Sequence, residues 1–166
     1  MSDLEFHARV AAHGDVLGVG IGARPEEWEA RLGADYVDDR SGALLRRDHG
    51  LVELTFQEER GSWSCLGFTV QVHRLRWDPG SAVPAALWDA YGGFGRSVRF
   101  GDLTAAVAAL GRTVEPDDDG TAADFRRYRV PGSGVRVLVR LAPGTPEAEC
   151  PVEKLDVSPA WWGVTG

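Results

Sequence analysis

A pattern in the first half of the chain recurs in the second half, and this repetition constrains the fold more than any single motif. Leu32-Gly33 ends one predicted helix, and Leu110-Gly111 ends another. A hydrophobic residue followed by two arginines comes next in both halves, as Leu45-Arg46-Arg47 and as Phe125-Arg126-Arg127. A repeated unit of this kind predicts a fold built from two similar halves.

Each half is predicted to be a helix followed by an antiparallel meander. The two units span about residues 16–75 and 96–157, and a connector at 76–95 joins them. An apolar strand follows the arginine pair in each unit, at 51–57 and at 135–141, and the first of these alternates apolar and polar side chains. We therefore predict a single α+β domain over the whole chain, with both helices on one face of a continuous sheet.

Local signals place the ends of several elements. Pro25 begins the first helix, since proline fits the first helical position. We expect Asp102 to cap the second helix, because aspartate favours that place. Residues 63–75 are predicted to form one long strand. Cys65 and Cys150 come late in their units, so we expect both on matching core strands.

Composition and charge limit the classes of function. The chain has 166 residues, 43% of them hydrophobic, which is enough for a core, and a net charge of −7. An acidic chain is unsuited to nucleic acids, whose binding depends on Lys and Arg neutralising phosphates, and it suits a basic protein partner. The same acidity is typical of a surface whose charge serves solubility alone.

The expected setting is the cytoplasm. Two cysteines are too few for a disulfide-stapled secreted scaffold, so both are expected to be free thiols. The first residues form no apolar secretory signal, and no stretch approaches the roughly 20 apolar residues of a membrane span.

The motifs predict no catalytic residue, metal or cofactor. The glycines of Gly18-Val19-Gly20-Ile21-Gly22 lack the spacing of a dinucleotide fingerprint. The four histidines lack the spacing of metal ligands. Cys65 and His73 would lie about 26 Å apart on one extended strand, which is too far for a catalytic dyad.

Acidic loops and a tryptophan pair are the candidates for a partner-binding surface. Asp38-Asp39 and Asp117-Asp118-Asp119 occupy corresponding places in the two units, so we expect them to form one acidic patch. Three adjacent carboxylates cannot all face one ion, so no cation site is predicted there. Trp161 and Trp162 either fold back onto the core or anchor a partner.

Four segments of the first half carry a resemblance to known proteins: WEARLG at 28–33, YVDD at 36–39, LRRDHGLVELTF at 45–56 and VQVHRL at 70–75. They resemble small uncharacterised proteins of Streptomyces-type actinobacteria, some of which resemble immunity proteins of polymorphic toxin systems. The predicted plan is also similar to that of the β-lactamase inhibitor protein, which is built from tandem repeats and binds its enzyme across a concave sheet. This chain lacks that inhibitor's secretion signal and disulfides. Both resemblances imply protein binding rather than catalysis.

Two functions follow as hypotheses. The first is a non-catalytic protein-binding module, an immunity protein that neutralises a toxin by occluding its active site, with a basic toxin domain as partner. The alternative is a small-molecule-binding or enzymatic domain that uses a groove between the two units, with Arg47, Glu53 and His73 pointing into it. The sequence leaves the oligomeric state open, including association through a sheet edge or the tryptophan pair.

Overall fold

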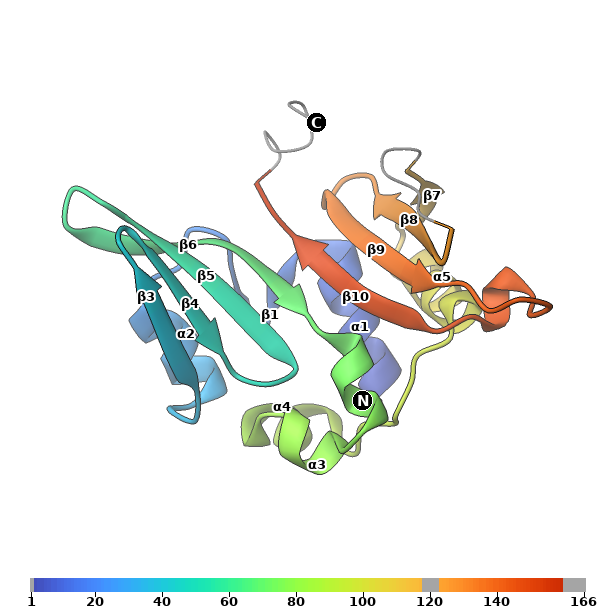
Figure 1. Ribbon diagram of the computed structural model, residues 1–166, viewed down its shortest axis with the longest axis horizontal. Helices are drawn as coiled ribbons and strands as arrows, with labels where there is room; N and C mark the ends of the chain where they lie inside the picture. The colour runs from blue at the N-terminus through green and yellow to red at the C-terminus, as the bar shows by residue number, and fades with distance from the viewer. Residues whose placement is uncertain (1, 118–122, 160–166) are drawn as a thin grey trace.

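The strands of this chain alternate buried and solvent-facing side chains, which gives the sheet one apolar face and one open face. The computed structural model describes residues 2–117 and 123–159, and Figure 1 shows its helices behind and below a broad sheet. The helices are α1 (Asp3–His13), α2 (Pro25–Leu32), α3 (Pro79–Ala82), α4 (Ala85–Tyr91) and α5 (Phe100–Ala109), with the 3₁₀ segments η1 (Val72–Arg76) and η2 (Glu147–Glu149). The strands are β1 (Asp15–Val16), β2 (Val19–Gly20), β3 (Val37–Ser41), β4 (Leu44–Asp48), β5 (Val52–Glu59), β6 (Ser62–Val70), β7 (Glu115–Pro116), β8 (Phe125–Val130), β9 (Val135–Arg140) and β10 (Val152–Val157).

Eight strands form one antiparallel sheet in the order β3-β4-β5-β6-β10-β9-β8-β7. The first four strands make one meander and the last four make another, and the two meet where β6 pairs with β10. This seam is short, because only residues 68–70 of β6 pair with residues 155–157 of β10. Nearer its start, β6 bonds instead to the segment after β2, since the Cys65 amide donates to the Ala23 carbonyl at 2.8 Å.

Helices cover the apolar face of the sheet. Val52, Leu54 and Phe56 of β5 are fully buried on this face. Trp28 of α2 is also fully buried, and its ring lies edge-on to Phe68 of β6 with 5.1 Å between the centroids. Burial of each such side chain is worth about 1.5–3 kcal/mol, so this face supplies most of the core.

The prediction of an α+β fold is confirmed, and so are several local expectations. α2 begins at Pro25. The chain leaves α2 at Gly33, whose φ of +88° lies in the region that favours glycine. β5 alternates buried and half-buried residues as its sequence predicts. These features depend on neighbouring residues, which is why the sequence reveals them.

Two boundary predictions are wrong. The strand predicted over residues 63–75 ends at Val70, where the chain turns into η1. Residues three apart lie on the same side of a 3₁₀ helix, so this turn buries both Val72 and Leu75. α5 begins after Arg99, so Asp102 lies in its first turn, where a carboxylate interacts favourably with the helix dipole.

The two cysteines do not occupy matching strands. Cys65 lies within β6, whereas Cys150 follows η2 and precedes β10. Both are buried free thiols in the part of the chain that is described. Their role in packing is therefore similar, but their structural positions differ.

The sequence analysis did not predict α1, which lies against β9 and α5 on the apolar face. Ser2 caps this helix by accepting a hydrogen bond from the Glu5 amide. Phe6 and Val10, four residues apart, are buried on its inner side. Because α1 precedes the first predicted unit, the apolar face is covered by more than the two expected helices.

α1 also buries a histidine. His7 is 1% exposed, and its ring lies 5.2 Å from Phe6 and 6.0 Å from Phe94. Within the described residues, neither ring nitrogen has a hydrogen-bond partner. Burial lowers the pKa of His7 from 6.5 to about 4, although the negative charge of Asp3 acts to raise it. The side chain is therefore neutral in the folded protein near pH 7.

We predict that His7 makes folding sensitive to mild acid. The folded pKa lies below 6.5, so the unfolded chain takes up the proton first and stability falls as the pH drops from 6.5 towards 4. This one group lowers the free energy of unfolding by about 3 kcal/mol over that range. Urea unfolding of wild type and His7→Phe at several pH values measures this change in stability. The carboxylates are the same in both proteins, so the difference between the two curves is due to His7.

The exposed His13 of the same helix provides the control, and the stability of His13→Gln should follow that of wild type. A His7→Phe curve parallel to wild type would contradict this prediction.

Candidate functional site

The face of the sheet opposite the helices, which we call the open face, carries polar side chains from both meanders. Its members alternate with the buried residues of the same strands. Near the seam and on the second meander they are Thr55, Thr69, Arg127, Arg129, Arg136 and Asp156. This face is therefore mostly polar where it spans the junction of the two halves, and Val37 and Leu44 add exposed apolar side chains on the first meander.

A shallow hollow lies at the centre of the open face. It has a volume of about 250 Å³, and Thr55, Thr69, Arg136 and Asp156 are among the residues that line it. The Thr69 hydroxyl donates to the Asp156 carboxylate across the seam, with 2.8 Å between the oxygens. Gly67 also lines the hollow, and a Cβ atom there would come 2.8 Å from the Val157 carbonyl oxygen. The close approach of β10 to β6 thus requires glycine at this place.

Charge is distributed unevenly over the open face. The strands β3, β4 and β5 of the first meander contribute Asp39, Asp48 and Glu53, together with Arg46. The strands β8 and β9 contribute the arginines named above, and Asp117, which directly follows β7, lies 3.8 Å from Arg136. A partner of this face therefore meets acidic groups on one side of the seam and guanidinium groups on the other.

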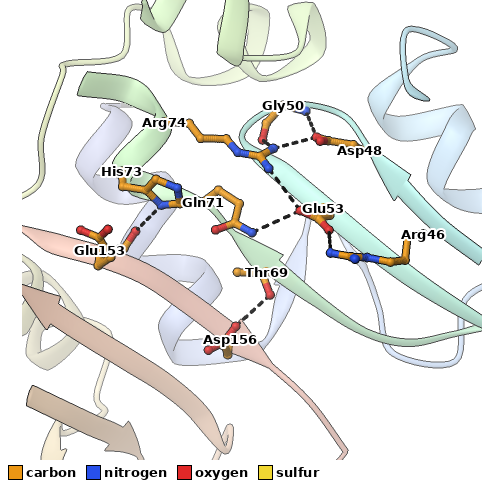
Figure 2. A network of polar contacts seen from close by, with 10 residues as sticks. All are labelled: Arg46, Asp48, Gly50, Glu53, Thr69, Gln71, His73, Arg74, Glu153 and Asp156. Carbon is orange, nitrogen blue, oxygen red and sulfur yellow. Dashed lines mark hydrogen bonds and ion pairs between the residues drawn. The ribbon is translucent and has the colours of Figure 1, made fainter. Parts of the chain in front are cut away.

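A network of ion pairs fixes η1 to the first meander, and Figure 2 shows it beside the seam. Arg74 bonds to the Asp48 carboxylate at 2.8 Å and to the Gly50 carbonyl at 2.7 Å, and it reaches Glu53 at 3.3 Å. Glu53 also accepts from the Gln71 amide at 3.2 Å. The Glu53 carboxylate is thus occupied by neighbouring donors, and its contacts stabilise the turn from β6 into η1.

The three residues expected in a groove between the units are not brought together. Glu53 lies in the network just described, and the His73 ring faces the Glu153 carbonyl oxygen with 3.3 Å between Nδ1 and that oxygen (Figure 2). Arg47 lies on the opposite face of the sheet, because it is opposite the buried Leu54 in the β4–β5 register. None of the three candidates lines the central hollow.

Arg47 is a buried cation with a fixed partner. Its side chain is 8% exposed and forms two hydrogen bonds to the Asp38 carboxylate, at 2.9 and 3.1 Å. The guanidinium also lies 3.8 Å from the centre of the Tyr36 ring. Asp38 therefore neutralises Arg47, and its own side chain remains 37% exposed.

The described members of the predicted acidic patch are not brought together. Asp38 and Asp39 lie on β3, whereas Asp117 directly follows β7, and these strands are the two opposite edges of the sheet. Seven strand spacings of about 4.8 Å separate such edges. The other predicted partner residues, Asp118, Asp119, Trp161 and Trp162, lie outside the described residues.

The Cys65 thiol is unreactive in the folded protein. Burial raises the pKa of the Cys65 thiol to about 12, so this sulfur is protonated and a poor nucleophile. Across residues 2–117 and 123–159, no three His, Cys, Asp or Glu side chains are grouped so as to hold a metal ion. In the same residues, no helix is both long and apolar enough to span a bilayer.

Scans against protein-family models, curated proteins and solved structures find no match to this chain. The resemblances inferred from the sequence therefore remain predictions. The residues that the sequence analysis missed are those of the hollow, notably Arg136 and Asp156. Both residues alternate with buried valines and a leucine, and this pattern indicates that they face outward. The pattern does not indicate that β9 and β10 lie beside β6, which is what places these residues in the hollow.

We predict that Asp38 and Asp39 differ in their effect on stability. Asp38→Asn removes the charge that neutralises a buried guanidinium and should lower the free energy of unfolding by about 1–2 kcal/mol, a value reduced for the partial exposure of Asp38. The neighbouring exposed Asp39 is the matched control, and Asp39→Asn should change stability by less than about 0.5 kcal/mol. Urea unfolding measures both, and equal effects would contradict the structural role of Asp38.

Proposed function

We propose that this chain is a non-catalytic protein-binding module, and most concretely an immunity protein that neutralises a toxin by occluding its active site. The observation that carries the proposal is the open face, a polar surface that no helix covers in the described part of the chain. Its binding mode would be steric, with the sheet laid across the active site of the partner. The proposal requires no catalytic group on this chain.

The dimensions of the open face support a protein partner. Eight strands spaced by about 4.8 Å are roughly 34 Å wide, and a six-residue strand is about 20 Å long. Their product, on the order of 700 Å², is close to the roughly 800 Å² that each partner buries in a standard protein interface. The hollow at its centre, about 250 Å³, is smaller than the roughly 300 Å³ at which small-molecule pockets begin.

The charges of the chain bear on the kind of partner. A net charge of −7 speeds encounter with a basic protein, which suits the proposed basic toxin domain. At close range, the arginines of β8 and β9 would face acidic groups of the partner. We propose a partner that is basic overall and carries acidic side chains within the surface that meets β8 and β9.

We also propose that the two meanders descend from one duplicated unit. Support comes from the strand order, which runs outward from the seam in the same way on both sides, and from the helix before each meander. The arginine pairs give weaker support than their sequences suggest. Arg47 faces the helices, whereas Arg127 lines the hollow on the open face, so the two motifs differ by one residue in register.

We predict that a bulky residue at the hollow abolishes partner binding. Co-expression with the product of the adjacent gene, in a growth assay with pull-down, should show rescue and a stable complex. Thr55→Arg places a long side chain at the centre of the open face and should weaken the complex at least tenfold, about 1.4 kcal/mol.

The control adds an arginine on the other side of the molecule. Ala30 is an exposed residue of α2, so Ala30→Arg should retain both rescue and complex. Circular dichroism would verify that both variants are folded. Loss of binding in Ala30→Arg alone would place the interface elsewhere. Absence of any complex with the wild-type protein would count against the immunity function itself.

A further inference from the structure

A second concave surface lies at one end of the sheet, away from the hollow. It is a groove of about 390 Å³, and three arginines from separate parts of the chain line it, together with Ser97 and Glu149. Arg76 ends η1, Arg99 precedes α5 and Arg140 ends β9. The groove therefore collects three cations that the sequence places far apart.

The backbone holds two of these arginines in fixed positions. Arg99 forms an isolated antiparallel bridge with Pro151, and the Arg140 amide donates to the Pro151 carbonyl at 3.0 Å. On either side of the bridge, Val152 bonds to Val98 at 2.8 Å and Phe100 bonds to Cys150 at 2.9 Å. Both side chains thus project from a segment that is already ordered, which lowers the entropy lost when a ligand binds.

The positive charge of the groove is only partly balanced by neighbouring carboxylates. Arg76 lies 3.6 Å from the Glu153 carboxylate and remains 42% exposed. Within the described residues, no carboxylate lies within ion-pair distance of Arg99 or Arg140. Glu149 is the one acidic residue among those that line the groove. Positive charge has thus accumulated here in a protein whose net charge is −7.

The chemistry of arginine indicates the ligand. The planar guanidinium offers a fork of N–H donors that matches the paired oxygens of phosphate and carboxylate groups. A phosphate group carries more than one negative charge and at least three acceptor oxygens, so it can bind several guanidinium groups together. The volume of the groove lies within the roughly 300–1,000 Å³ of small-molecule sites, and the Ser97 hydroxyl provides a neutral donor.

We infer that the groove of Arg76, Arg99 and Arg140 binds a small multivalent oxyanion, and that a phosphorylated small molecule is its ligand class. This site is separate from the open-face hollow and does not rest on the proposed function. It also does not require any catalytic step, because its residues supply charge and hydrogen-bond donors only.

Isothermal titration of the full chain with pyrophosphate, in a buffer free of divalent cations and at low salt, tests this inference. We expect one binding site and at least a tenfold loss of affinity in the double variant Arg99→Gln/Arg140→Gln. The matched control removes two exposed arginines elsewhere, Arg31→Gln/Arg60→Gln, and should bind like wild type. Thermal unfolding of each variant verifies that it is folded.

Three results would overturn the inference. The first is the absence of pyrophosphate binding to the wild-type chain. The second is an equal loss of affinity in both double variants, which would show attraction without a defined site. The third comes from a tetraglutamate peptide titrated in parallel. If the peptide binds through Arg99 and Arg140 and pyrophosphate does not, the groove recognises an acidic protein segment instead.

Discussion

The pairing of β6 with β10 is the contact on which the rest of the structure depends. It joins a meander from the first half of the chain to one from the second half, and it does so through residues 68–70 and 155–157 only. Gly67 lets the end of β10 come close to β6, and Thr69 bonds to Asp156 across the junction. Without this pairing there would be two narrow sheets, and neither would offer a surface of the size that a protein partner needs.

The two faces of the sheet differ in how they hold charged and polar groups. On the helix side, charged or polar groups are enclosed and serve folding: Arg47 is neutralised by Asp38, and His7 is held neutral among aromatic rings. On the open side, charged groups remain accessible to solvent, and the Arg74 network fixes the turn that leads away from the seam. A residue's charge therefore says little about its role until its face is known. Asp38 is an example, because its carboxylate neutralises a buried guanidinium on the helix side.

The parts of the fold that the sequence predicts are those set by nearby residues. The alternation of β5, the start of α2 at Pro25 and the α+β class all follow from local patterns. The strand order does not, because a pairing between distant strands leaves no local signal. Two expected groupings are absent from the described residues for that reason: Asp38 and Asp117 lie at opposite edges of the sheet, and Arg47 faces away from Glu53. The arginine groove was likewise invisible, since its members come from three elements that only the folded chain brings together.

The seam has a consequence for how the protein is made. During synthesis the first meander leaves the ribosome with one edge of residues 68–70 of β6 unpaired, since these residues bond to β5 on the other side. Their partner β10 is made only after the rest of the second meander. An unpaired strand edge is a template for pairing with other chains, and contacts between distant segments form slowly. The nascent chain is therefore exposed to aggregation until β10 arrives, and translation that stalls before Val152 leaves an edge for a second chain to occupy.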